Sequence, residues 1–172
     1  MANGFSYLRK TTSPEATKQL AATLAPHLRP GDVVLLSGDL GAGKTQFVQG
    51  VAAALHVADP VTSPTFNLMI SYTEGDLPLY HFDLYRLRAP QDLEDIAYFE
   101  TLEGDGVSFV EWGDKFPGTT PFDYVNIALC VGEEGMRSVH VQAFGERARR
   151  LVFLWANDSR SRLQKTAADF EC

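Results

Sequence analysis

Residues 38–45 of this 172-residue chain read GDLGAGKT and fit the phosphate-loop pattern G-x-x-x-x-G-K-[ST] at every specified position. Glycines let consecutive backbone N–H groups point into one concavity, where they can bind nucleotide phosphates at the start of a helix. In such a loop Lys44 places its charge on the β- and γ-phosphates, and the Thr45 hydroxyl holds a magnesium ion that bridges them. The pattern therefore predicts a binding site for a nucleoside triphosphate and Mg²⁺.

The segments on either side of this loop have the patterns of a strand and a helix. Residues 32–37 form a short apolar run typical of a buried strand, and residues 46–57 repeat apolar side chains at helical spacing. Strand, glycine-rich loop and helix in this order favour a nucleotide site over the alternative, a glycine-rich turn with a solvated lysine. The other predicted strands cover residues 66–73, 79–85, 107–110, 124–131 and 136–144, and a helix begins near residue 90. We therefore expect an α/β fold, a three-layer phosphate-loop domain with a mixed sheet.

Two carboxylates compete for the role of the acid beside the magnesium ion. Asp83 lies in an alternating run on the same face as His81 and Tyr85, and such a polar row favours a hydrogen-bonded site over a solvated face. Glu111 ends the apolar run 107–110, and an apolar strand that ends in a carboxylate is typical of the metal side of phosphate-loop proteins. We expect this strand to lie beside the strand before the loop. Glu111 would then be the magnesium ligand, while Asp83 acts on the chemical step.

Four further residues are candidate contacts, each with a plainer alternative. Ser13 stands at the start of a helix predicted over residues 12–28, where it can contact a nucleotide or simply cap the helix. Ser63 and Thr65 lie in an irregular segment after the loop helix, which is either a switch near the γ-phosphate or a turn before a strand. Arg137 can reach a phosphate or remain a surface charge.

Composition places limits on the class of protein. The mass of 19.0 kDa is that of a single domain with one hydrophobic core. Hydrophobic residues make up 45% of the chain and charged residues 22%, as in an ordinary globular protein. No run approaches the length of a membrane span and no signal peptide is visible, so we expect a cytoplasmic protein. A formal net charge of −7 argues against autonomous binding to nucleic acid. The two cysteines, Cys130 and Cys172, are too few and too badly placed for a disulfide framework or a zinc site, and Cys130 is expected to fill the core.

The last part of the chain has a composition of its own. Residues 145–172 carry six basic side chains around one apolar patch at residues 151–155. This pattern predicts a short strand or helix followed by a polar, partly disordered end. We therefore divide the chain into a phosphate-loop ATPase domain, residues 1–144, and a C-terminal extension of unknown role, residues 145–172.

Five motifs together resemble the TsaE (YjeE) family of small bacterial ATPases. They are the loop GDLGAGKT, then SPTF at residues 63–66, HFDLYR at 81–86, LEDI at 93–96 and VEW at 110–112, in matching order and spacing. The resemblance runs from about residue 13 to residue 144. It departs in Gly113, where many relatives have proline, and in the tail, which has no match.

The resemblance implies a site and partners. ATP phosphates would lie on Leu40, Gly41, Ala42, Gly43, Lys44 and Thr45, with magnesium on Thr45 and Glu111 and a switch segment around Thr65. Asp83 would prepare the attacking water or support the metal. The implied function is ATP hydrolysis in threonylcarbamoyl-adenosine modification of tRNA, together with the proteins TsaB and TsaD. ATP turnover would be weak until a partner completes the site, and tRNA would be met only through that complex.

Two other classes of function use the same loop. A small-molecule or nucleoside kinase would transfer the γ-phosphate to an acceptor, and it should carry a lid with arginines and an acceptor pocket. A nucleotide-sensing interaction module would bind ATP and hardly hydrolyse it. The central region offers few candidates for a lid or an acceptor pocket, which favours the accessory ATPase.

Overall fold

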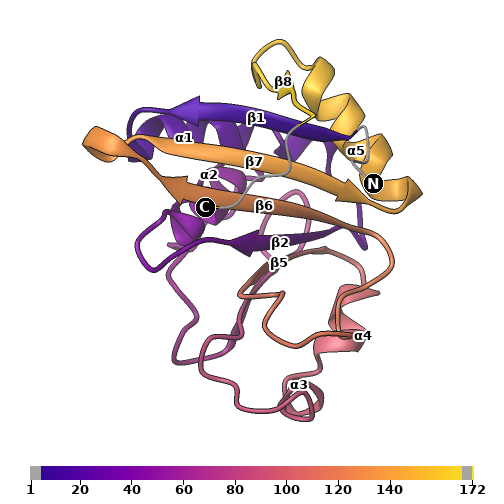
Figure 1. Cartoon of the computed structure of the whole chain (residues 1–172). Coiled ribbons are helices and arrows are strands. Elements are labelled where there is room, and N and C mark those ends of the chain that lie inside the picture. The colour runs from indigo at the N-terminus through magenta and orange to yellow at the C-terminus, as the bar shows by residue number, and fades with distance from the viewer. Residues whose placement is uncertain (1–4, 168–171) are drawn as a thin grey trace.

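The computed structural model describes residues 5–167 and residue 172. One mixed sheet of eight strands has the order β3-β4-β5-β2-β6-β7-β1-β8, and the strands β1, β7, β6 and β2 follow one another down the view in Figure 1. The strands are β1 (Ser6–Thr11), β2 (Val33–Ser37), β3 (Met69–Tyr72), β4 (Leu79–Asp83), β5 (Val107–Glu111), β6 (Tyr124–Val131), β7 (Arg137–Phe144) and β8 (Gln164–Lys165). Strands β4, β5, β2 and β6 are parallel, whereas β3 at one edge and β7, β1 and β8 at the other pair antiparallel.

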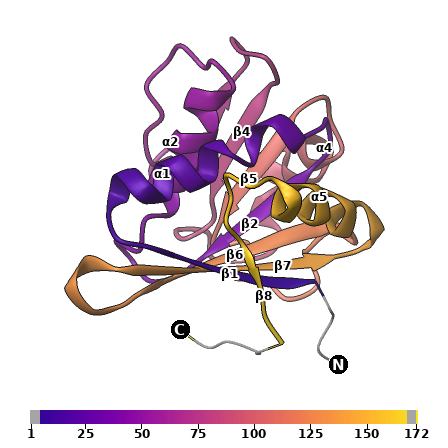
Figure 2. The same ribbon diagram turned by 90° about the horizontal axis from the view of Figure 1, so that it is seen from above.

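Helices cover the two faces of this sheet. They are α1 (Pro14–Ala22), the 3-10 turn η1 (Ala25–His27), α2 (Lys44–Ala54), α3 (Asp92–Asp95), α4 (Tyr98–Leu102) and α5 (Glu146–Asn157), while the turn η2 (Glu133–Gly135) connects β6 to β7. The helices α1, α2 and α5 lie on the same side of β1 and β7 in Figure 2. The strands expected over residues 66–73 and 79–85 pair as β3–β4, and those expected over residues 124–131 and 136–144 pair as β6–β7. The expected α/β fold with a mixed sheet is confirmed.

Strand β2 shows why the layers form as they do. Its side chains alternate between two apolar clusters: Val34 and Leu36 pack with α1, α2 and α5, while Val33 and Leu35 pack with α3 and α4. A strand buried on both faces must be apolar, as β2 is over its first four residues, all of which are buried. The central strand before the phosphate loop is therefore held from both sides.

Several boundaries differ from the sequence-based expectations. The first helix was expected to reach residue 28, but α1 ends at Ala22 and the chain continues through η1, whose Pro26 lacks a backbone donor. The helix expected near residue 90 is split into α3 and α4 at Ala97, which has a left-handed backbone conformation (φ 51°). Strand β1 was not expected at all. Its burial does not alternate, so it carries no period-two pattern to indicate a strand.

The tail contributes to the core of the sheet. Helix α5 buries its apolar face, Ala148, Leu151, Val152 and Trp155, in the same cluster as the inner side chains of β7. Trp155 is fully buried, packs edge to face on Phe47 of α2, and donates its indole N–H to Thr23 Oγ1 at 2.8 Å. The predicted short strand or helix is thus a 12-residue helix. The division of the chain at residue 144 stays a prediction, and part of the end expected to be disordered, residues 168–171, lies outside the described residues.

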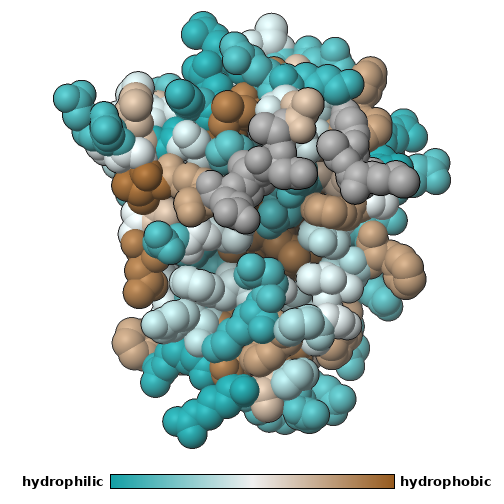
Figure 3. Space-filling model, viewed as in Figure 1, coloured by the Kyte–Doolittle hydropathy of each residue, from teal (hydrophilic) through white to brown (hydrophobic). Residues whose placement is uncertain are grey.

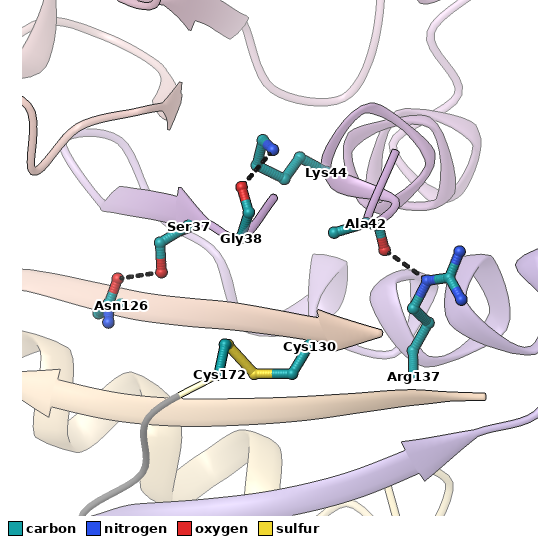
Figure 4. The surroundings of a disulfide bond; sticks show 8 residues. All are labelled: Ser37, Gly38, Ala42, Lys44, Asn126, Cys130, Arg137 and Cys172. Carbon is teal, nitrogen blue, oxygen red and sulfur yellow. Dashed lines mark hydrogen bonds between the residues drawn. A yellow bond between two sulfur atoms is a disulfide. The ribbon is translucent and has the colours of Figure 1, made fainter. Parts of the chain in front are cut away.

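The cysteines were predicted wrongly. Cys130 of β6 and Cys172 form a disulfide with their Cα atoms 5.2 Å apart (Figure 4). Cys130 is half-buried, not a core residue. The expectation failed because the two residues are 42 positions apart in sequence, and only the fold brings the chain end back to β6.

None of the helices in the described ranges, 5–167 and 172, has the length and apolar character needed to cross a membrane.

Candidate nucleotide site

The phosphate loop lies between the end of β2 and the start of α2. Gly38 has φ +138°, and a Cβ atom there would lie only 2.4 Å from the carbonyl oxygen of Leu129 on β6, so the close approach of the two backbones requires glycine. Gly43 stands just before α2 with φ +108°, in the left-handed region that glycine tolerates. The backbone thus turns within a few residues and presents the N-terminus of α2 to a ligand.

Lys44 is folded back onto the loop. Its Nζ donates to the carbonyl oxygens of Gly38 at 2.7 Å and Asp39 at 3.0 Å, and it lies 4.8 Å from the centre of the Trp112 ring. Figure 4 shows the side chain pointing toward Gly38. Burial lowers the pKa of Lys44, and the nearby carboxylate of Glu111 opposes that shift. A partly desolvated ammonium beside the loop is suited to an anionic partner.

Glu111 is buried at the end of β5 and holds a short chain of hydrogen bonds. Its Oε1 accepts from Thr45 Oγ1 at 2.8 Å and lies 2.9 Å from His81 Nε2. Strand β5 pairs with β2 in parallel, with Glu111 opposite Leu36, which confirms the predicted neighbourhood of the two strands. The imidazole of His81 is fully buried. Its Nε2 contacts the same carboxylate oxygen that accepts from Thr45.

Asp83 lies next to Glu111, because the two residues are register partners on β4 and β5. Its Oδ2 accepts from Thr65 Oγ1 at 2.7 Å, and its Oδ1 accepts from the backbone N–H of Tyr85 at 2.9 Å. The Thr65 hydroxyl is also 2.7 Å from Ser63 Oγ. The segment after α2 is therefore tied to the acid of β4, so Asp83 is not a solvated surface charge.

These residues line one open cavity of about 310 Å³. The lining residues are Leu40, Gly41, Gly43, Lys44, Thr45, Gln46, Ser63, Thr65, Asp83, Tyr85, Glu111 and Trp112. Most of the predicted site residues thus share one cavity. Leu40, 70% exposed, and Tyr85, 45% exposed, stand at its rim.

Arg137 and Ser13 have other contacts in this structure. Arg137 Nε donates to the carbonyl oxygen of Ala42 at 2.8 Å and its Nη2 to that of Gly41 at 3.2 Å, so the arginine of β7 braces the loop from outside (Figure 4). Ser13 Oγ accepts from Ala16 N at 3.0 Å and caps α1. Nucleotide contacts of these two residues stay predictions. Ser13 follows closely after Thr11, whose register partner is Arg137, so the start of α1 is near the brace.

Sequence reasoning gave no role to Trp112, which lines the cavity, or to His81, which contacts the lining residue Glu111. His81 was noticed only as part of a polar row, whereas it contacts Glu111 directly. Trp112 has φ +60°, which is uncommon for a bulky side chain, and its ring packs 5.1 Å from that of Tyr85. Its position beside Glu111 was the one available signal. The strained backbone directs the ring toward Lys44.

The oxygen atoms present fit a magnesium ion. Mg²⁺ prefers six oxygen ligands at about 2.0–2.1 Å, so neighbouring ligand atoms lie about 2.9 Å apart. Thr45 Oγ1 and Glu111 Oε1 are 2.8 Å apart. In the described part of the chain no three His, Cys, Asp or Glu side chains are grouped to hold a metal by themselves. Magnesium would thus bind here together with phosphate oxygens of the substrate, as it does in kinases and ATPases.

A parallel core of strands, a glycine-rich loop entering a helix, and an acid at the end of the neighbouring strand define the class: a P-loop NTPase-like protein. The family model described as "Threonylcarbamoyl adenosine biosynthesis protein TsaE" matches residues 11–139. The chain belongs to the TsaE family.

Individual relatives agree with this assignment. A protein of Nostoc sp. named tRNA threonylcarbamoyladenosine biosynthesis protein TsaE is 43% identical over 134 residues, covering 76% of this chain and 82% of the relative. One of the same name from Bacillus subtilis is 39% identical over 142 residues, covering 83% of this chain and 89% of the relative. The crystal structure of B. subtilis YdiB superposes with a TM-score of 0.75 at 34% identity and covers 88% of this chain and 94% of that one.

Proposed function

We propose that this protein is a magnesium-dependent ATPase that acts in threonylcarbamoyladenosine modification of tRNA, together with TsaB and TsaD, in the cytoplasm. The relatives named above are biosynthesis proteins of this modification. One observation carries the ATPase proposal: Thr45 and Glu111 place two oxygen atoms at the spacing of magnesium ligands directly beside Lys44.

The residues in and around the cavity have separate roles in binding phosphate, in binding magnesium and in positioning. Lys44 exchanges its two carbonyl acceptors in the loop for phosphate oxygens, which are stronger partners for an ammonium. Thr45 and Glu111 would hold a magnesium ion, which when bound would supply positive charge beside the phosphates. His81 keeps the Glu111 carboxylate turned toward Thr45. Each of these groups acts on charge or position and none forms a bond to the substrate.

Asp83 and Thr65 serve the attacking water. Thr65 lies in the segment that follows the loop helix and is bonded to Asp83, so a γ-phosphate that contacts this segment also repositions the acid. Asp83 accepts a hydrogen bond from the water, whose oxygen forms a bond to the γ-phosphorus. The bond from that phosphorus to the bridging oxygen of ADP breaks, and the proton of the water leaves to solvent. ADP and inorganic phosphate are the products.

Partners complete the site from the open side. Leu40 and Tyr85, which line the cavity, are 70% and 45% exposed, and Phe66, which directly follows the lining residue Thr65, is 84% exposed. Exposed apolar side chains around an open cavity are typical of surfaces that other proteins cover. TsaB and TsaD would shield the attacking water and order the segment around Thr65, so the isolated chain hydrolyses ATP weakly.

ATP hydrolysis by the isolated chain and by its mixture with TsaB and TsaD tests this proposal. We expect slow release of phosphate alone and at least tenfold faster release in the mixture. Label from [γ-³²P]ATP should appear as inorganic phosphate and on no nucleoside or other small-molecule acceptor. Labelled acceptor would establish a kinase instead, and tight ATP binding without hydrolysis in the mixture would establish a nucleotide sensor.

A further inference from the structure

The charge of the chain is divided unevenly between two parts of the fold. Residues 5–11 and 145–167 hold eight of the 15 Lys and Arg residues but two of the 22 Asp and Glu residues. These ranges form β1, α5 and β8, which lie at the top of Figure 1, far from α3 and α4 at the bottom. The net charge of −7 therefore hides a strongly basic region.

A cavity of about 530 Å³ lies within this region, between β1, α1 and the turn that follows α5. Arg9, Arg160 and Arg162 line it together with the polar side chains of Gln19 and Ser159. Lys165 extends the basic character beyond the cavity, because it is the register partner of Tyr7, which is on the same face of β1 as Arg9. We call these four basic residues, Arg9, Arg160, Arg162 and Lys165, the basic edge.

Two of the arginines are not neutralised. Arg160 forms a two-point ion pair with Asp158, at 2.6 and 2.9 Å, and that acid also contacts His27. Arg9 and Arg162 form no ion pair within the described residues. Two guanidinium groups beside one cavity repel each other until an anion lies between them. Asp158 is already paired with Arg160 and His27, so it does not neutralise Arg9 or Arg162.

The turn that carries Arg162 is well fixed. Ser161 is fully buried, its backbone N–H donates to the Asp158 carbonyl oxygen at 2.9 Å, and Leu163 belongs to the large apolar cluster. Arg162 itself is exposed. The upper part of the surface in Figure 3 is largely hydrophilic. A guanidinium on a fixed backbone loses less entropy on binding than one on a mobile chain.

We propose that the basic edge binds the phosphate backbone of RNA. Planar guanidinium forks match phosphate oxygens in pairs, and a basic row that continues outside a cavity suits a chain of phosphates better than a single ion. The inference rests on the proposed function in tRNA modification, and it names the face of the protein that meets the RNA held by the complex. It also limits the expectation from net charge: binding by the isolated chain is weak at physiological salt and appears when salt is lowered.

Fluorescence anisotropy with end-labelled tRNA and the full chain, from 50 to 200 mM salt, tests this proposal. The plot of log K against log salt has a negative slope, to which each phosphate contact contributes about 0.9 in magnitude. The variant Arg9→Gln/Arg162→Gln should therefore make this slope shallower by about 2. If the two contacts contribute nothing at about 1 M salt, their loss lowers the RNA affinity at about 0.15 M salt by about thirtyfold. Gln19→Glu keeps both arginines but places an acid in the same cavity, and it should also weaken binding.

The control Arg29→Gln/Arg88→Gln removes two positive charges from exposed residues outside the cavity. Equal losses in both double variants would mean that net charge alone governs binding, which overturns the proposal. Unchanged RNA affinity with weakened binding to TsaB and TsaD would also overturn it, since the surface would then dock a protein. Hydrolysis of ATP is measured in the same samples. If the Arg9→Gln/Arg162→Gln variant keeps both its partner-stimulated ATP hydrolysis and the RNA affinity of the wild type, this inference alone is refuted. If the wild-type protein does not hydrolyse ATP, the proposed function is refuted.

Discussion

The phosphate-loop cavity and the tail helix are attached to the same sheet by different kinds of contact. The cavity is built from buried polar groups, with His81, Glu111 and Asp83 each less than 5% exposed and hydrogen-bonded to a neighbour. Helix α5 is held by apolar packing around Trp155. Buried polar groups cost stability unless they are fully bonded, whereas apolar burial stabilises directly. Stability and chemistry should therefore respond to different substitutions.

The largest effect that separates the two regions should come from Trp155→Ala. The change leaves a cavity beside Phe47 and removes the hydrogen bond to Thr23, so unfolding should become easier by about 3–5 kcal/mol. Urea denaturation measures this difference. Phe153→Ala is the matched control on the same helix, since that side chain is 54% exposed, and it should cost less than about 1 kcal/mol. Equal losses in both variants would show that α5 is not packed as described.

Lys44→Ala should do the opposite of Trp155→Ala: it should weaken ATP binding strongly and change the stability of the fold little. It removes the ammonium from the phosphate loop, and two charge-assisted hydrogen bonds to phosphate are worth about 3 kcal/mol, a loss of ATP affinity of about a hundredfold. Stability should change little, because Lys44 carries a desolvation cost in the free protein. Calorimetric titration of ATP provides the measurement, with Lys18→Ala as the control. Full ATP affinity in a folded Lys44 variant would contradict the assignment of the loop.

The smallest effect concerns the charged contact of the tail, and it depends on pH. Asp32 accepts from Arg147 Nε of α5 at 2.9 Å, and burial raises the pKa of Asp32 despite this partner. An acid with a raised folded-state pKa binds protons more readily when folded. The stability it contributes is present at low pH and is lost as pH rises from the ordinary value of 3.8 through the raised one. Between pH 3 and 7, Asp32→Asn should flatten this decline in urea midpoints. A steeper decline of the urea midpoint with pH in Asp32→Asn would mean that the Asp32 carboxyl affects the stability with the opposite sign.

How much was predictable from sequence differs between the same two regions. The phosphate loop, Glu111 and the parallel neighbourhood of its strand could be predicted, because glycine placement and apolar runs are local signals. The contact of His81 with Glu111 depends on the register of β4 against β5, which no local pattern specifies. Similarly, the disulfide of Cys130 and the meeting of Arg9 with Arg162 join residues far apart in sequence. Tertiary pairing of this kind needs the fold.

The division of roles between Glu111 and Asp83 is the central claim about the site. Calorimetric titration of ATP, with and without Mg²⁺, into the wild type, Glu111→Ala and Asp83→Asn tests it most directly. Glu111 contacts Thr45 and should be the metal ligand, so its variant should lose the increase in affinity that Mg²⁺ gives, by about tenfold or more. Asp83 contacts the segment of Thr65, so its variant should keep that increase and lose partner-stimulated hydrolysis. The reverse result, with the effect of Mg²⁺ lost in Asp83→Asn and kept in Glu111→Ala, would contradict the account.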